Sequence, residues 1–305
     1  MAFQDAYRQQ VALLIRTIPF VAQEQCFALK GGTAINLFVR DLRRLSVDID
    51  LTYLPVEDRA SSLAAIDAAM VRIKERIEGG IPGAAVAPSR SAGDNIITKL
   101  IVRSEGVQIK IEVTPVLRGT VYDPVVMSVV PAVEDTFGFA EMQVVSFPDL
   151  YAGKIVAALD RQHPRDLFDV RDLLANEEIS DELRRAFLVY LISHNRPMAE
   201  VLAPTHKPLA EEFERGFVGM TQENVELADL EATREALVAT MVGEMPDAHH
   251  QFLIGFKRGD PNWELLGIPE ARHLPAVLWK QRNLEKMLSE KRKELIEVLE
   301  KVLLG

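Results

Sequence analysis

The stretch SVDIDLTY, residues 46–53, alternates in character: its even-numbered residues are polar and its odd-numbered residues are apolar. A period of two is typical of a β-strand that buries one face. Asp48 and Asp50 then lie on the same face, with Cα atoms roughly 6.6 Å apart. Neighbouring carboxylates repel each other unless a cation lies between them. A divalent metal is the simplest such cation, since hard cations prefer oxygen ligands. The alternative is the solvent-facing side of an edge strand.

A glycine turn, Gly31–Gly32–Thr33, precedes this strand and lies between an expected strand at 27–29 and an expected helix. Glycines let the backbone approach a phosphate closely, and amides at the start of a helix point at the anion. Thr33 adds a hydroxyl group. Such a turn is also consistent with a simple helix start in which Thr33 is the cap. A phosphate cradle followed closely by a two-acid strand favours a nucleotide site.

A third acid is available in VQIKIEV, residues 107–113. Its alternation places Lys110 and Glu112 on one face and the apolar residues on the other. If this strand lies beside 46–53, Glu112 can join Asp48 and Asp50 as a metal ligand. The alternative is an exposed Lys–Glu pair on an amphipathic strand.

A second group of charged residues lies at 154–174, where Pro164 suits the first turn of a helix. Aspartates recur there every three residues, at 166, 169 and 172. In a functional interpretation, Lys154 binds triphosphate oxygens as a compact charge, and Asp169 orients Lys154 or the attacking hydroxyl. In the alternative, Arg165 and Asp169 form an ordinary ion pair on a helix surface.

The chain of 305 residues is long enough for two domains. Strand patterns and helical patterns mix before residue 146, and long helices follow Pro148, so we predict an α+β protein with a boundary near residue 146. A hairpin is expected at 96–103 and 107–116, with further short strands near 125–130 and 142–145. Helices are expected at about 5–18, 60–78, 148–160, 165–175, 180–193, 208–217, 224–242, 247–257 and 276–303.

The net charge is −10, which excludes a protein that coats nucleic acid without specificity but allows a local basic patch. Basic residues near the motifs that could guide an RNA end are Arg40, Arg43, Arg44, Lys154, Arg161, Arg165 and Arg171. No apolar run approaches the roughly 20 residues that span a bilayer, and the N-terminal stretch 1–20 reads as an amphipathic helix. The single cysteine, Cys26, excludes an internal disulfide. We therefore expect a cytoplasmic protein with no membrane partner.

Two other enzyme classes find no support in the sequence. The neighbouring histidines His249 and His250 are not part of an HExxH motif or of any spaced His/Cys set, so a zinc hydrolase is not indicated and both are expected on a helix surface. No GxxxxGK[ST] motif is present, which argues against a P-loop ATPase. Trp263 and Trp279 are expected to pack within the helical region.

Taken together, these segments resemble the AbiEii family of nucleotidyltransferase toxins, which includes the mycobacterial MenT toxins and belongs to the DNA polymerase β-like nucleotidyltransferase superfamily. The matching stretches are KGGTAINLF (30–38), RRLSVDIDL (43–51), IKIEV (109–113) and KIVAALDRQHPRDLFDVRDLL (154–174). FKRGDPNWELLG (256–267) and LPAVLWKQRNLEKM (274–287) are similar to the closing region of the family. The resemblance extends over most of the chain.

The resemblance implies a nucleotidyltransferase-type mixed β-sheet with flanking helices in residues 1–146. Residues 147–305 would form a helical domain that completes the active-site cleft. The roles carried over by position are nucleotide phosphate binding by Gly31, Gly32, Thr33, Ser46 and Lys154, metal binding by Asp48 and Asp50, and a helical acid needed for activity at Asp169. Asp166 is a rival for the role of Asp169. Glu112 fits the middle strand of the family.

The resemblance also implies a reaction. An NMP would pass from an NTP to an acceptor, with pyrophosphate leaving and Mg²⁺ or Mn²⁺ as cofactor. The expected acceptor is the 3′ end of tRNA, as in the MenT toxins, which would block aminoacylation and translation. Acceptors that are proteins or small molecules remain open, as does a non-catalytic nucleotide-binding module. The expected partner is a cognate antitoxin protein.

Overall fold

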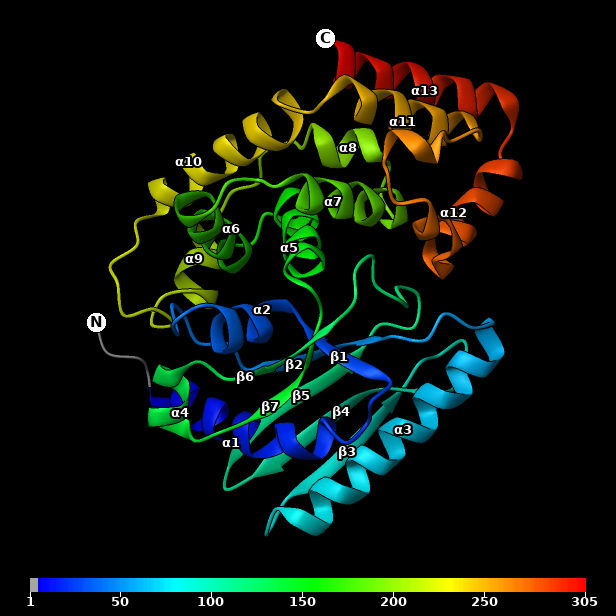
Figure 1. The fold of residues 1–305 in the computed structure, drawn as a ribbon. Coiled ribbons are helices and arrows are strands. Elements are labelled where there is room, and N and C mark those ends of the chain that lie inside the picture. Colours follow the sequence, from blue (N-terminus) through cyan, green and yellow to red (C-terminus); the bar gives the residue numbers. More distant parts are fainter. Residues whose placement is uncertain (1–4) are drawn as a thin grey trace. The chain divides into compact units, whose positions relative to one another are not determined.

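The computed structural model describes residues 5–305 (Figure 1), so residues 1–4 of the amphipathic stretch 1–20 lie outside the described part. The chain divides into two compact units. The sheet unit comprises the described residues up to Ser146 together with Val218–Asn224, and the helical unit comprises Phe147–Phe217 and Val225–Gly305. The division at Ser146 coincides with the change in sequence pattern, whereas the return of Val218–Asn224 to the first unit has no counterpart in that pattern.

The sheet unit is built on a seven-stranded mixed sheet with the order β3-β4-β5-β2-β1-β7-β6. Its strands are β1 (Phe27–Lys30), β2 (Asp48–Tyr53), β3 (Ala85–Arg90), β4 (Ile97–Ser104), β5 (Val107–Val113), β6 (Val125–Ser128) and β7 (Glu141–Val144). The pairs β2–β5 and β1–β7 are parallel, and the remaining neighbours are antiparallel. β2 therefore lies in the interior of the sheet, between β1 and β5, and not at its edge.

The helices of the sheet unit are α1 (Asp5–Val21), α2 (Gly31–Ala34), α3 (Arg59–Gly80) and α4 (Pro131–Phe137), and α2 continues as a π-helical turn, Ile35–Val39. α1 and α3 contact each other and pack on the sheet strands β5 and β4, respectively (Figure 1). The Asp58 side chain caps α3 by accepting hydrogen bonds from the backbone amides of Ala60 and Ser61. The apolar stripe of α3 is fully buried at Ile66, Met70 and Ile73, which gives the sheet a core on this face.

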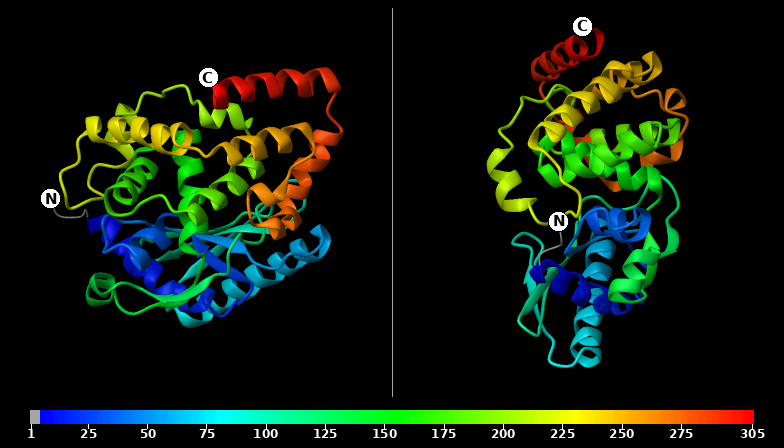
Figure 2. Two further views of the ribbon diagram at one scale, coloured as in Figure 1. Left: turned by 45° about the horizontal axis from the view of Figure 1, so that its top comes forward. Right: turned by 90° about the vertical axis from the view of Figure 1, so that its left-hand side faces the viewer.

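The helical unit contains α5 (Phe147–Arg161), α6 (Pro164–Asn176), α7 (Asp181–Ser193), α8 (Met198–Leu202), α9 (Ala210–Gly216), α10 (Leu227–Val238), α11 (Asp247–Arg258), α12 (Pro275–Glu285) and α13 (Ser289–Leu304). A π-helical turn, Ala239–Gly243, extends α10, and 3₁₀ turns lie at Trp263–Leu265 and Pro269–His273. α5 packs against α6, α7 and α8, and α13 runs along α11 (Figure 2). Tyr151, Phe168, Phe187 and Phe252 fill the interior of this unit.

Two expected elements differ from the structure. The single helix expected at 276–303 is two helices, α12 and α13, because the chain leaves the helical conformation at residues 286–288. The turn lets α12 pack on α7 while α13 packs on α11. The sequence pattern predicts no strand at β3, which contains Pro88; the structure tolerates this proline because β3 is an edge strand.

The strand expected from Ser46 begins only at Asp48, so Ser46 lies just before β2. The expected hairpin is present as β4 and β5. Within the described residues, no helix combines the length and the apolar character needed to cross a membrane.

Candidate active site

The glycine turn brings the backbone directly against the acids of β2. Gly31 has φ +74°, in the left-handed region that favours glycine. A Cβ atom at Gly31 would lie 2.6 Å from Asp50 Oδ2, so the Asp50 carboxylate would have to shift. The turn and β2 are held together because Lys30 pairs with Asp50 in the antiparallel register of β1 and β2. The backbone conformation therefore favours glycine at position 31, and any side chain there would push the Asp50 carboxylate out of its present position.

Gly32 packs against a buried arginine. A Cβ atom there would lie 2.6 Å from Arg44 Nη2 and 3.0 Å from Ser46 Oγ. The Arg44 side chain is buried, and its Nη1 donates to the carbonyl oxygen of Leu45 at 3.0 Å. A guanidinium cation thus lies beneath the turn, where it favours an anion at the backbone amides. Arg44 was expected only as a surface residue that guides RNA, and its burial corrects that expectation.

Thr33 ties the turn to the start of β2. The side chain is fully buried, and its hydroxyl donates to the Asp48 carbonyl oxygen at 2.5 Å. Its Oγ1 also lies 3.0 Å from Ser46 Oγ, which is in position to donate to it. Because a hydroxyl carries a single proton, these two contacts use Thr33 as both donor and acceptor. The structure thus gives the Thr33 hydroxyl a bracing role between turn and strand.

Asp48 and Asp50 share the half-buried face of β2, while Ile49 and Leu51 are fully buried on the other face. Lys110 of β5 is in register with Asp48, and its Nζ lies 3.5 Å from Asp48 Oδ1. Burial lowers the pKa of Lys30, and the nearby Asp50 carboxylate opposes that shift. The two acids therefore lie beside two lysines. The sequence motifs assigned no role to Lys30, although its position immediately before the two glycines could have indicated one.

Glu112 lies where the strand prediction places it, on β5 and in register with Asp50. Its carboxylate forms an ion pair with Lys99 of β4. No group of three His, Cys, Asp or Glu side chains forms a metal-holding arrangement among residues 5–305. Glu112 is thus adjacent to the two aspartates but is bound to a lysine, and its role as a metal ligand stays a prediction.

The donor set of β2 fits a Mg²⁺-type ion that is completed by its substrate. Magnesium in phosphate-transfer sites is held through one or two carboxylates plus phosphate oxygens and waters. Asp48 supplies one carboxylate that is 29% exposed, and Asp50 supplies a second, partly exposed one on the same face. Both are oxygen donors beside a turn whose amides suit phosphate. Two carboxylates on one strand meet that requirement without a third protein ligand.

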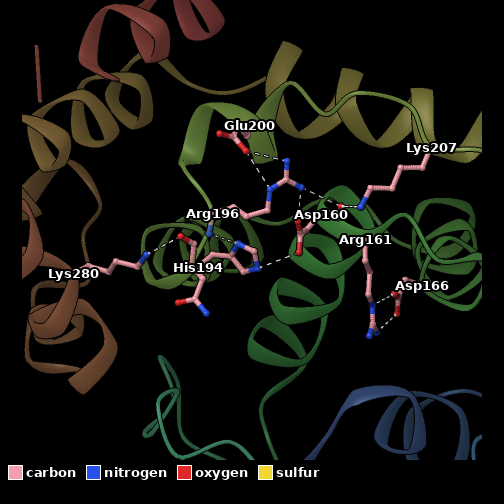
Figure 3. Close-up of polar contacts among 9 residues, drawn as sticks. Asp160, Arg161, Asp166, His194, Arg196, Glu200, Lys207 and Lys280 are labelled. Atoms are coloured by element: carbon pink, nitrogen blue, oxygen red, sulfur yellow. Dashed lines mark hydrogen bonds and ion pairs between the residues drawn. The ribbon is translucent and has the colours of Figure 1, made fainter. Parts of the chain in front are cut away.

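The helical unit holds the second expected group of charges. Lys154 of α5 is buried, and its Nζ lies 2.8 Å from Asp166 Oδ1 and 3.0 Å from Asp169 Oδ2, both on α6. Arg161 adds a bidentate contact to Asp166 (Figure 3). The choice between Asp166 and Asp169 as the partner of Lys154 therefore does not arise, since the ammonium group contacts both. The helix-surface pair considered for Asp169 is wrong, because the Asp169 side chain is buried.

The pKa of Asp166 reflects the balance between burial and the two nearby cations. Burial by itself would raise that pKa, but the Lys154 ammonium and the Arg161 guanidinium outweigh burial and hold it well below its ordinary value. Asp166 is thus ionised at neutral pH although it is buried. Two buried carboxylates around one buried lysine make a rigid, hydrogen-bonded group.

A family described as nucleotidyl transferase AbiEii toxin, type IV toxin–antitoxin system, matches residues 12–280. The chain belongs to the AbiEii family. The matched range includes the glycine turn, β2, β5 and the charged cluster on α5 and α6. A search of curated proteins finds no match.

A solved structure is similar to this AbiEii-family chain. MenT4, a nucleotidyltransferase toxin from Mycobacterium tuberculosis, superposes with a TM-score of 0.61 and 16% sequence identity, over 96% of this chain and 94% of MenT4. At that identity the similarity establishes the fold. The predicted α+β class with a nucleotidyltransferase-type mixed sheet is therefore confirmed.

Most of the basic residues that were expected to guide RNA contact other side chains of this AbiEii-family protein. Arg43 lies 3.5 Å from Glu223 and Arg171 stacks over the Phe168 ring at 4.7 Å. Arg161 keeps its side chain 62% exposed while it binds Asp166. The buried Lys154 serves the internal cluster. Of these side chains, Arg161 best combines a surface position with positive charge.

Two further expectations are wrong. His249 is buried within α11 instead of lying on a helix surface. Trp279 is 47% exposed, whereas Trp263 packs edge-on against Phe252 as expected of a core residue. Neither difference changes the site.

Proposed function

We propose that this AbiEii-family toxin transfers an NMP from an NTP to the 3′ end of tRNA and so stops translation. The observation that carries the proposal is the contact between Gly31 and Asp50, which joins a phosphate-binding type of turn to a two-carboxylate strand. The family match supports the reaction class. The acceptor hydroxyl oxygen attacks the α-phosphorus, the bond to the β-phosphate oxygen breaks, and pyrophosphate leaves.

The protein contributes mainly position and charge to such a reaction. The backbone amides of the glycine turn bind the nucleotide phosphates, and the buried Arg44 beneath Gly32 keeps the local potential positive. Ser46 supports the triphosphate end. Asp48 and Asp50 hold Mg²⁺ or Mn²⁺, which when bound supplies Lewis-acid stabilisation of the charge that builds on phosphate oxygens.

In the helical unit, we assign Lys154 to phosphate binding and Asp169 to holding it in place. Asp169 suits that task because its Oδ2 lies 3.0 Å from Lys154 Nζ. Asp166 and Arg161 complete the group around the lysine. We also propose that a cognate antitoxin protein controls the toxin, as the type IV system of the family indicates.

The proposal is tested by incubating the purified protein with total tRNA and each α-labelled NTP in turn, in the presence of Mg²⁺. We expect label in the tRNA band with at least one NTP, at the 3′ end, and loss of aminoacylation. Label on a protein or on a small molecule would replace the tRNA acceptor with another. Nucleotide binding without transfer to anything would point to a non-catalytic module.

A further inference from the structure

The helical unit contains a second charged feature, a cavity of about 170 Å³. It lies between the α7–α8 connection, the end of α11, α12 and the start of α13. Its ionisable lining residues are Arg196, Lys257, Lys280 and His194, and burial lowers the pKa of His194; its apolar walls include Met198 and Met287. Among the residues of 5–305 that line it, none is an aspartate or a glutamate. The cavity is thus lined by one arginine, two lysines and a histidine, without an acid among these lining residues.

Arg196 and His194 already have partners that do not line the cavity. The Asp160 carboxylate lies 2.6 Å from Arg196 Nη1 and 3.4 Å from His194 Nε2 (Figure 3). Arg196 also binds Glu200 at 3.1 Å, and Lys207 donates to the Asp160 carbonyl oxygen at 2.8 Å. This network compensates the charge of Arg196 and fixes the wall formed by the α7–α8 connection.

The other two cations are not compensated. Lys257 is 9% exposed, and in the described part of the chain its ammonium group makes neither a hydrogen bond nor an ion pair. Lys280 donates only a long hydrogen bond, 3.4 Å, to the Asn195 carbonyl oxygen (Figure 3). Its Nζ also lies 5.3 Å from the centroid of the Trp279 ring. Burial lowers the pKa of Lys257, and burial followed by repulsion from Lys257 lowers the pKa of Lys280. A buried ammonium without an anion is costly, so an anion beside Lys257 would stabilise it.

We propose that this cavity binds a phosphate monoester dianion, with the phosphate between Lys257 and Lys280. Two ammonium groups match the two negative charges of the dianion, and each offers donors to its oxygens. The small volume suits one phosphate group, and Met198 and Met287 give apolar contact to whatever carries the ester. The site is independent of the proposed nucleotidyl transfer, because none of its residues belongs to the turn, β2 or the Lys154 cluster.

The test uses [methyl-¹³C]methionine NMR on the full chain, with inorganic phosphate as the probe. Met198 and Met287 line the cavity and report on it. Met220 lies in the sheet unit, where its carbonyl oxygen accepts the Leu45 amide at 2.8 Å, and it reports separately on the glycine-turn region. We expect the Met198 and Met287 signals to shift with a saturable curve as phosphate rises to about 10 mM, a range that brackets a Kd of ~1 mM. A shift confined to Met220 would place phosphate binding elsewhere and overturn the proposal.

Variants assign the site to the two lysines. Lys257→Gln and Lys280→Gln should each weaken phosphate binding by about tenfold or more, equivalent to ~1.4 kcal/mol. Lys293→Gln removes the same charge from an exposed position on α13 and should leave binding unchanged. Equal binding by wild type, Lys257→Gln and Lys280→Gln would sink the assignment. Because each lysine is tested separately, misfolding of one variant leaves the other to decide.

A final comparison identifies the source of the phosphate. A nucleoside 5′-monophosphate should shift the same two signals, and the matching nucleoside should not. If a short RNA with a 5′-phosphate binds more tightly than the mononucleotide and loses that advantage without the phosphate, the ligand is an RNA terminus. If the mononucleotide binds at least as well, the ligand is a free phosphate ester. A nucleoside that binds as well as its monophosphate would refute the site, since the lysines would then be irrelevant.

Discussion

Gly31 and Asp50 are packed so closely that a single added Cβ atom on the glycine would lie 2.6 Å from Asp50 Oδ2. The two residues come from different elements, a turn after β1 and the interior strand β2. Their contact places backbone amides and a carboxylate side by side, which is the combination that a metal–triphosphate complex requires.

Gly31→Ala should abolish nucleotidyl transfer. The alanine Cβ would displace the Asp50 carboxylate, and a non-glycine residue at φ +74° costs about 1–2 kcal/mol. The measurements are transfer of labelled NMP and the midpoint of thermal unfolding. Gly79→Ala is the matched control: it lies in α3 with no atom near the new Cβ, and it should keep activity and gain about 0.4–1 kcal/mol of stability. Full activity in Gly31→Ala would contradict the tight contact.

Asp48→Asn and Asp50→Asn should each lose transfer while keeping the fold. Asparagine preserves the size of the side chain but removes the negative charge that holds a divalent cation. Circular dichroism and thermal unfolding check the fold, and labelled-NTP transfer checks activity. Asp67→Asn, a change of the same kind at the Arg90 ion pair, serves as control and should remain active. The metal assignment would fail if either β2 variant retained wild-type rates.

Removal of metal should reversibly stop the reaction. Chelation with EDTA takes away the cation that Asp48 and Asp50 are expected to hold, and the two carboxylates alone repel a triphosphate. Transfer should return on addition of Mg²⁺ or Mn²⁺ and not on addition of Na⁺. Undiminished transfer in EDTA would show that the chemistry proceeds without a divalent ion.

Lys154→Met should destabilise the helical unit by about 3–5 kcal/mol, because it leaves two buried carboxylates without their shared cation. Urea unfolding at neutral pH measures the loss. The double variant Lys154→Met with Asp169→Asn should recover part of that stability, since one uncompensated charge is removed. A single variant as stable as the wild type would mean that the buried ion pairs contribute little.

The stability that Asp166 contributes should depend on pH in a defined direction. Its folded pKa lies well below the ordinary value of 3.8, so the folded state holds the ionised form more strongly than the unfolded state does. The contribution is complete above the unfolded pKa and is lost as pH falls from there toward the folded pKa. Comparing urea unfolding of wild type and Asp166→Asn from neutral pH down to about pH 3 should show their difference shrinking at the acid end. A difference that grows on acidification would reverse the assignment.

Local patterns in the chain were sufficient for several parts of the site. Alternation at 46–53 predicted β2 and the common face of Asp48 and Asp50, because side chains two residues apart on a strand point the same way. The paired glycines predicted a turn, and position 31 does adopt a left-handed conformation. The spacing at 107–113 predicted β5, although only the structure made it the parallel neighbour of β2.

Tertiary structure alone decided the contacts between distant segments. Nothing local marks Arg44 as the buried cation beneath Gly32, or shows that Val218–Asn224 joins the sheet unit through the Leu45–Met220 hydrogen bond. Likewise, helical spacing makes Asp166 and Asp169 neighbours, but packing of α5 on α6 brings both to Lys154. The physical reason is that periodicity records whether a side chain is buried, whereas its partner depends on how the whole chain closes around it. The sequence thus determined most of the elements and the candidate site residues of β2, and the folded chain determined which charges meet.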